Sequence, residues 1–273
     1  MLDEIQEIRV ETLGKLVDLA TPREADPVSG RLRSPTVFRG CRQTSGPLYT
    51  SLDRLGGIDP PHGKAHLEEH ILRNFMRYSR PHLAQPLQNP WELLVTAQHH
   101  GLPTRLLDWS YSPLVAAHFA TVGEGSGERV VWRLDWAAVH RHFGLPPLAF
   151  LVEDVGELLG AQGVPSLWEL FDLPDGGPAR FVSMPDPPAL EARIIAQAAS
   201  FTVCSDKTRS FDRILAENGL LGALTRFVIP AERVAHIRDQ LDLVTMDERR
   251  LFPDLDGVAA EMRRYYQPSG PAA

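Results

Sequence analysis

The chain has few lysines and no long apolar run. Its 28 basic residues include only three lysines, Lys15, Lys64 and Lys207, and its 35 acidic residues give a formal net charge of −7. This balance excludes a generally polycationic surface for nucleic acid or anionic membrane, but it leaves room for a local basic groove. No apolar stretch approaches the roughly 18 residues that span a bilayer. We therefore expect no membrane partner.

Cysteine and the strongest enzyme signatures are also scarce. The two cysteines, Cys41 and Cys204, exclude a disulfide framework and favour a reducing compartment. The start, MLDEIQEIRV, lacks the basic and then apolar pattern of a signal peptide, so we expect a cytoplasmic protein. No GxxxxGK[ST], GxGxxG, GxSxG or HExxH motif occurs, which excludes the enzyme classes that carry them.

Arginine, in contrast, is abundant. Setting the three lysines aside leaves 25 arginines among the 28 basic residues. Codon bias in a GC-rich genome explains most of them, which fits the 23 prolines and 21 glycines. The planar guanidinium matches phosphate and carboxylate groups, so a few of these arginines are candidates for an anion site.

Apolar spacing, caps and chain breakers predict helices and strands that are interspersed without a regular alternation. The expected helices cover most of residues 1–20, 66–79, 89–98, 114–121, 211–218, 231–241 and 254–265. The expected strands cover residues 36–38, 104–109, 130–134, 180–184, 200–203 and 225–229. This order favours an α+β fold over a repeating parallel architecture, and we predict a single domain.

Three histidines, His62, His66 and His70, recur at every fourth position. This spacing would align metal ligands on one face of a helix. However, prolines and a glycine flank the first histidine and keep it out of a helix, and no carboxylate or cysteine completes a ligand set. We interpret the three as a solvated helix face and predict no metal site.

The densest group of polar side chains is Gln98–Trp109, QHHGLPTRLLDW. Groups for acid–base work and anion binding lie there beside a sharp Gly/Pro turn, a common place for a site. The alternative is structural. His99 and His100 would simply end a helix, which is favourable at its negative end, and Arg105 and Asp108 would form an ion pair. Both interpretations stay open.

A second candidate is Phe38-Arg39-Gly40 at the end of an expected strand. An arginine followed by a glycine that lets backbone approach a ligand is typical of a phosphate or ribose clamp. The alternative is a surface ion pair. Cys41 follows directly, but no local signature of a nucleophile accompanies it, so we interpret both cysteines as structural.

Together these segments resemble the FRG domain, a family named for its Phe-Arg-Gly motif and found mainly in bacteria and phages. The matching segments are Phe38–Gly40, Trp91–Trp109, Ser112–Ala120, Arg193–Gln197, Phe201–Thr202 and Leu251–Gly257. The resemblance covers about residues 36–260. We expect an FRG-type domain over residues 36–265, preceded by a helix and loop over 1–35 packed on its core and followed by a disordered tail over 266–273.

The chain is also similar, more distantly, to mono-ADP-ribosyltransferases. The similarity lies in the order of a strand with Arg-Gly, the segment Trp109–Ser112 leading into a helix, and Glu191–Arg193 leading into a later strand. This resemblance implies an ADP-ribosyltransferase-like split β-sandwich core with flanking helices, and NAD as substrate.

The resemblance assigns roles to individual residues. With the residues singled out above, we expect NAD to be bound by Arg39, Gly40, Arg105, Trp109, Ser110, Tyr111, Ser112 and Gln197, and we expect the catalytic residues to be Arg39, His100, Asp108 and Glu191. Arg39 would neutralise the diphosphate, the serines would bond ribose, and Trp109 or Tyr111 would stack on nicotinamide. A carboxylate would stabilise the oxocarbenium-like transition state.

The chain departs from the transferase pattern at two positions of the expected active site. Tyr111 stands in place of the threonine of a Ser-Thr-Ser strand end, and Arg193 stands in place of the second glutamate of Glu-x-Glu. An arginine cannot stabilise an oxocarbenium cation. Three alternatives stay open: Glu191 or Asp108 takes that role, a histidine supplies different chemistry, or the reaction has been lost.

The leading hypothesis is an enzyme that cleaves the nicotinamide glycosidic bond of NAD and transfers ADP-ribose to a protein or nucleic acid. It would act as a toxin or anti-phage effector with a neutralising antitoxin as a further partner. One alternative is a binding module for a nucleotide or nucleic-acid end that uses Arg39, His100 and Arg105. Another is a phosphodiester-cutting enzyme with His99 or His100 as acid or base.

Overall fold

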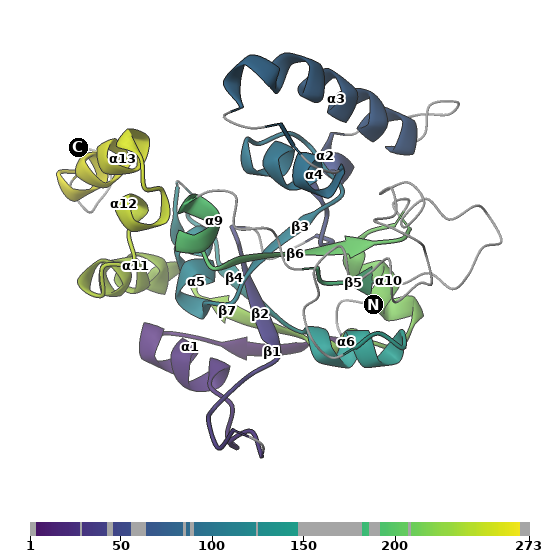
Figure 1. The fold of residues 1–273 in the computed structure, drawn as a ribbon. Helices are drawn as coiled ribbons and strands as arrows, with labels where there is room; N and C mark the ends of the chain where they lie inside the picture. The colour runs from purple at the N-terminus through teal and green to yellow at the C-terminus, as the bar shows by residue number, and fades with distance from the viewer. Residues whose placement is uncertain are drawn as a thin grey trace.

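The computed structural model describes residues 4–27, 29–42, 46–55, 64–83, 86–87, 90–123, 125–146, 182–185, 192–206 and 209–267. Within these ranges one sheet has the strand order β1-β7-β4-β2-β3-β6-β5 (Figure 1). The strands are β1 (Gln6–Arg9), β2 (Thr36–Cys41), β3 (Leu107–Ser110), β4 (Arg129–Asp135), β5 (Val182–Ser183), β6 (Ala199–Cys204) and β7 (Leu224–Ile229). β1 and β7 run parallel, and the other neighbours are antiparallel.

Helices and short 3-10 turns fill the connections between strands. The helices are α1 (Leu13–Ala20), α2 (Ser51–Arg54), α3 (Lys64–Ser79), α4 (Pro90–His99), α5 (Pro113–Thr121), α6 (Trp136–His142), α9 (Ala192–Ala196), α10 (Phe211–Glu217), α11 (Val234–Leu243), α12 (Glu248–Leu251) and α13 (Leu255–Tyr265). The 3-10 turns are η2 (Arg80–His82), η3 (Leu221–Ala223) and η4 (Ala231–Arg233). Helices and strands are thus interspersed around a mostly antiparallel sheet, and this confirms the mixed helix-and-sheet class.

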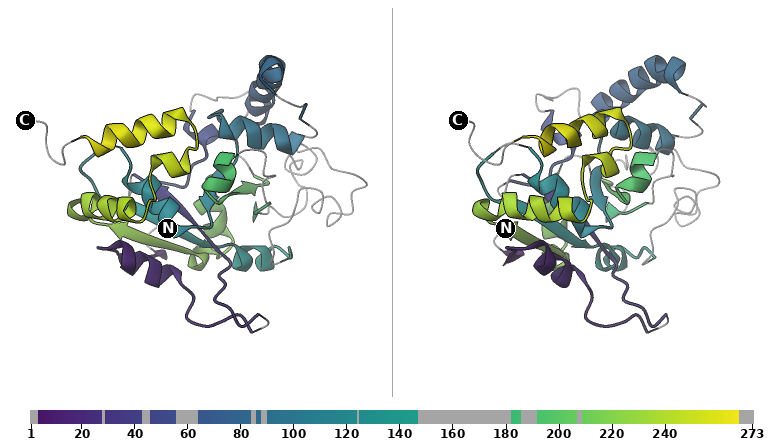
Figure 2. Two further views of the ribbon diagram at one scale, coloured as in Figure 1. Left: turned by 60° about the vertical axis from the view of Figure 1, so that its left-hand side comes forward. Right: turned by 90° about the vertical axis from the view of Figure 1, so that its left-hand side faces the viewer.

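Two apolar layers enclose the sheet. On one face, α1, α5 and α11 bury their apolar sides against strand residues such as Phe38, Val131 and Phe227. On the other face, α6 and α10 pack against Val37 and Trp132. The C-terminal helices α11, α12 and α13 lie one above the other at one side of the molecule in both Figure 1 and Figure 2.

A third apolar cluster joins α3 and α4 to the far half of the sheet. Leu72, Trp91 and Leu94 from these helices pack with Phe201 and Val203 of β6. α4 and α5 therefore border the same region of the sheet from two sides. Side chains of these two helices face the space between them.

The sheet is nearly divided between β2 and β3. β2 is paired with β4 along its whole length, whereas its only pair with β3 joins Phe38 and Ser110. β3 in turn pairs with β6 along all of its residues. In Figure 1, β6 runs across the molecule and β2 runs down it. We call this one-pair junction the seam.

Local sequence chemistry explains several helix starts. Ser112 caps α5 by accepting a hydrogen bond from the backbone N–H of Val115, and Pro113 occupies the first helical position, as predicted. Asp254 caps α13 in the same way through the N–H of Gly257. A side chain at Gly257 would lie 1.9 Å from the carbonyl oxygen of Phe252, so only glycine fits between α12 and α13.

The start of the chain corrects one expectation. Residues 6–9, expected to be part of a helix, form β1 and pair in parallel with β7. The helix begins only at Leu13, after the cap Thr12. β1 and α1 both lie against the core, and Leu16 is fully buried. Residues 268–273 lie outside the described residues, so the structure does not test the expected tail.

No described helix combines the length and the apolar character that crossing a bilayer requires.

Candidate functional site

A cavity of ≈ 840 Å³ opens over the seam. Its described lining comes from β2 and β3, the C-terminal end of α4, the inner side of α5, and the segment from α9 into β6. This volume lies within the roughly 300–1,000 Å³ that is typical of small-molecule sites. The two conspicuous motifs of the sequence, around Arg39 and around His99, thus meet at one place although they are far apart in the chain.

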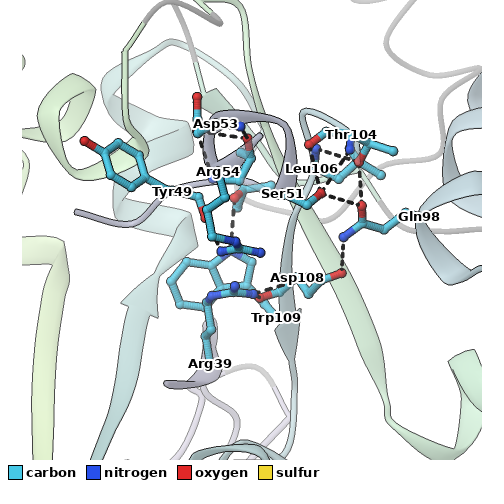
Figure 3. A network of polar contacts seen from close by, with 12 residues as sticks. Arg39, Tyr49, Ser51, Asp53, Arg54, Gln98, Thr104, Leu106, Asp108 and Trp109 are labelled. Atoms are coloured by element: carbon cyan, nitrogen blue, oxygen red, sulfur yellow. Dashed lines mark hydrogen bonds and ion pairs between the residues drawn. The ribbon is translucent and has the colours of Figure 1, made fainter. Parts of the chain in front are cut away.

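Arg39 and Asp108 form the polar floor of the cavity (Figure 3). Arg39 Nη1 donates to the carbonyl oxygen of Asp108 at 2.7 Å and lies 3.3 Å from its Oδ2. The guanidinium therefore bridges β2 and β3 next to the single pair of the seam. The Arg39 side chain is 15% exposed, whereas that of Asp108 is 51% exposed. The carboxylate is consequently the part of the pair that a ligand can reach.

Gln98 holds the other side of the same carboxylate. Its Nε2 donates to Asp108 Oδ1 at 2.7 Å, and its Oε1 accepts from the hydroxyl of Thr104 at 2.5 Å. The hydroxyl of Ser51 donates to the carbonyl oxygen of Thr104 at 3.3 Å and accepts from the Thr104 N–H at 3.0 Å. This chain of hydrogen bonds fixes the amide so that its NH₂ group faces Asp108 (Figure 3).

The end of α4 contributes two imidazoles. The helix ends at His99, one residue beyond the predicted end, and Gly101 follows in the left-handed region at φ +81°. The rings of His99 and His100 lie edge to face with centroids 5.2 Å apart, and both residues line the cavity. Helix termination and a place in the cavity are therefore compatible here.

The opposite wall is braced by the C-terminal helices. The guanidinium of Arg193 lies over the ring of Phe252, 4.5 Å from its centroid. Gln197 Nε2 donates to the carbonyl oxygen of Leu251 at 3.1 Å. Both Arg193 and Gln197 line the cavity. The wall thus depends on α12, although α12 is distant in sequence from the seam strands.

The Ser110 side chain and the Tyr111 backbone both hold a strained turn. The hydroxyl of Ser110 donates to the carbonyl oxygen of Gln197 at 2.7 Å, and the N–H of Tyr111 donates to that of Ala198 at 3.0 Å. Ala198 has φ +43°, a conformation that residues with a side chain rarely adopt. Ser110 also borders the cavity, whereas Tyr111 and Ser112 are absent from its described lining. Ser112 acts as the cap of α5.

Trp109 is held in the core. Because side chains alternate along a strand, Asp108 faces the cavity and its neighbour Trp109 faces the opposite layer. The indole N–H donates to the hydroxyl of Thr202 at 2.9 Å, and the ring packs 5.8 Å from that of Phe211. Trp109 is 3% exposed although it borders the cavity. The expected stacking of this ring on nicotinamide therefore finds no support in its position.

Arg105 lies away from the cavity, in contrast to its expected place in the anion site. Its guanidinium forms a buried ion pair with Glu68 of α3, and its Nε donates to Glu68 Oε2 at 2.5 Å. Its backbone N–H donates to Glu68 Oε1 at 2.9 Å. The ion pair expected between Arg105 and Asp108 is replaced by two separate pairs, Arg105 with Glu68 and Arg39 with Asp108.

Gly40 borders the cavity, but close packing explains the glycine. A Cβ atom there would lie 2.0 Å from the carbonyl oxygen of Ala116 and 2.5 Å from the backbone nitrogen of Ala120. The backbone that approaches Gly40 is therefore α5 and not a ligand. Glu191, the expected catalytic glutamate, lies outside the described residues, so its position is untested.

The lining residues that were not assigned to the site from the sequence include Arg42, Gln98 and Phe119. Gln98 belongs to the polar run that drew attention to the region, and Arg42 follows the Phe-Arg-Gly motif closely, so proximity to a motif was the available signal. Among the described lining residues, Asp108 is the single carboxylate, facing three arginines, Arg39, Arg42 and Arg193. The cavity therefore favours an anionic ligand that also carries a positively charged group.

Neither cysteine nor metal chemistry is indicated elsewhere in the described residues. Burial raises the pKa of the Cys204 thiol, so this group stays protonated and is a poor nucleophile. No three His, Cys, Asp or Glu side chains gather as metal ligands in the described ranges, which include His66 and His70 but not His62.

Comparison with known proteins gives one match. Residues 34–129 match the family model of the FRG domain. The match begins just before β2 and ends at the first residue of β4, so it includes both strands of the seam together with α4 and α5. This confirms the resemblance over that segment. No curated protein and no solved structure matches the chain.

Proposed function

We propose that this chain, which carries an FRG domain over residues 34–129, is an ADP-ribosyltransferase-like enzyme that cleaves NAD at the seam cavity and transfers ADP-ribose to a macromolecule. The observation that carries the proposal is the Asp108 carboxylate, half-exposed in the cavity and held by Arg39 and Gln98. It offers a fixed negative charge beside arginines, which suits a ligand with a diphosphate and a cationic ring.

In this mechanism the bond that breaks joins the ribose C1′ atom to the nicotinamide nitrogen. Nicotinamide leaves with the electron pair, and the sugar becomes oxocarbenium-like. The Asp108 carboxylate would stabilise that positive charge, and it needs no reorganisation because Arg39 and Gln98 already hold it. The acceptor then attacks C1′ and loses its proton, for which His99 or His100 would serve as base.

The remaining cavity groups would bind the substrate. The guanidinium groups of Arg42 and Arg193 suit the two phosphates, and Phe119 offers an apolar surface on the α5 side. Arg193 is then a phosphate-binding residue in this proposal. The carboxylate that the transferase pattern expects at the position of Arg193, in α9, would be supplied by Asp108 of strand β3. The strand division at the seam is also what a split β-sandwich core requires, and this supports the resemblance to transferases.

The test is nicotinamide release from NAD by the purified chain with cell lysate as the source of acceptors. Mass spectrometry of the lysate would identify macromolecules heavier by one ADP-ribose. Asp108→Asn keeps the shape of the side chain and removes its charge, so we expect release to fall by roughly 10²–10³-fold. Asp239→Asn, at an exposed position of α11, is the matched control and should leave release unchanged. Absence of release, or full activity of Asp108→Asn, would contradict the proposal.

A second candidate function rests on the pair of imidazoles. Because His99 and His100 both line the cavity, they could act as acid and base in cutting a phosphodiester bond. RNA degradation without NAD, abolished by His99→Gln or His100→Gln, would favour this function. Degradation that persists in both variants would exclude it.

A further inference from the structure

Helix α3 carries a second group of arginines, which is separate from the arginines that line the seam cavity. Arg73, Arg77 and Arg80 follow one another at spacings of four and three residues, so they share one face of the helix and its 3-10 extension. All three are exposed. Figure 2 shows α3 at the periphery of the molecule. We call these three residues the α3 arginine row.

The α3 arginine row has no acidic partner in the described part of the chain. Several arginines elsewhere are paired with carboxylates, for example Arg213 with Glu217 and Arg264 with Asp242. None of the three guanidinium groups makes a hydrogen bond or an ion pair with a described residue. In a chain with 35 acidic residues and a net charge of −7, three neighbouring arginines on one helix face form a local concentration of positive charge. Such a row is suited to an external polyanion.

The row also borders a hollow and an exposed aromatic ring. A surface hollow of ≈ 380 Å³ is lined by the row together with His70, Asn74 and Met76. Tyr78 is 65% exposed, and the guanidinium of Arg77 lies 5.2 Å from its ring centroid. Cationic groups beside an exposed aromatic are the combination that single-stranded nucleic acid uses, because phosphates bind the cations while bases stack on the ring.

We infer that the α3 arginine row is a binding surface for single-stranded nucleic acid. Arg73, Arg77 and Arg80 contact successive phosphates, Tyr78 provides a stacking platform for an unpaired base, and the hollow receives the sugar–phosphate backbone. An acidic peptide would satisfy the arginines but would leave Tyr78 and Met76 without a partner. A duplex would keep its bases stacked on each other and unavailable to Tyr78. The exposed ring therefore favours a single strand over both.

The experiment measures binding of a fluorescein-labelled oligouridylate of about 12 nucleotides to the full chain by anisotropy, across a series of salt concentrations. Three phosphate contacts predict that log K falls with log[salt] with a slope of about −2. Arg73→Gln/Arg77→Gln removes two contacts and should reduce that slope by about 1.4. Tyr78→Ala should weaken binding roughly tenfold with the slope unchanged, and Tyr78→Phe should restore it.

The matched control is Arg250→Gln/Arg263→Gln, which removes two exposed arginines from α12 and α13. It should leave both affinity and slope unchanged. Failure to bind the oligonucleotide, an equal effect of the control pair, or tighter binding of a duplex of the same length or of polyglutamate would each overturn the inference. The assay contains no NAD, so its outcome is separate from that of the proposed transferase activity.

Discussion

The buried ion pair between Glu68 and Arg105 leads to a sharp prediction about stability. Glu68 is fully buried and Arg105 is 5% exposed, so this ion pair lies almost entirely out of contact with water. Glu68→Leu or Arg105→Met breaks this buried ion pair by removing one of its partners, which costs about 3–5 kcal/mol of unfolding free energy. That is a large share of the roughly 5–15 kcal/mol that stabilises a typical domain.

The double variant separates the charge effect from the hydrogen bond. Glu68→Leu/Arg105→Met removes both charges and restores apolar contact, so most of the electrostatic cost disappears. The backbone N–H of residue 105, which donates to Glu68 Oε1 at 2.9 Å, is then left unsatisfied and costs about 1–3 kcal/mol. We therefore expect the double variant to be more stable than either single variant.

Urea unfolding followed by tryptophan fluorescence and far-ultraviolet circular dichroism gives the three free energies. Nucleotide binding by the folded variants is measured in parallel. The reasoning is refuted if Arg105→Met loses nucleotide binding while its unfolding free energy stays at the wild-type value. That result would return Arg105 to the anion site expected from the sequence.

Two further predictions concern the α5 side of the sheet. Gly40→Ala should lower the unfolding free energy by about 3 kcal/mol or more, because its Cβ would meet α5 backbone at 2.0 Å, whereas Gly14→Ala, with nothing within 4 Å, should be neutral or slightly stabilising in the same urea titration. His118 is fully buried, and desolvation, aided by the neighbouring Arg238, lowers its pKa from 6.5 to about 4. Between these two pH values the unfolded chain binds a proton that the folded chain does not, so stability should fall as the pH drops from about 6.5 to about 4, by on the order of 3 kcal/mol. His118→Gln should remove that part of the pH dependence in unfolding titrations at pH 4.5 and pH 7, and an unchanged dependence would show that another group causes it.

Local chemistry in the sequence was enough to predict much of the secondary structure. Ser112 and Pro113 fix the start of α5 with atoms only three residues apart, and Gly101 follows the end of α4. The alternation along β3 also carried information that was not used. Leu107 and Trp109 are two residues apart, so their side chains point to the same, buried face of the strand. The side chain of Asp108, between them, points to the opposite face and toward the cavity.

Features that depend on distant partners could not be predicted in the same way. β1 is a strand because it pairs with β7, more than two hundred residues further along the chain. Arg105 is a core residue because Glu68, on another helix, lies opposite it. A single sequence contains both residues of each contact but no signal that links them. An ion pair of Asp108 with Arg105, which is nearer in the sequence, could therefore be suggested, whereas its ion pair with Arg39 could not.

The seam has a consequence for how such proteins can diversify. Because Phe38 and Ser110 form the only backbone pair between the two halves of the sheet within the described residues, each half keeps its own ladder of hydrogen bonds. A change in the pairing within one half therefore requires no shift in the register of the other half. The Arg39–Asp108 contact lies at the boundary and is shared by both. The Arg39–Asp108 contact can therefore be retained while other residues of the cavity change. Related proteins could then differ in the ligand that they bind.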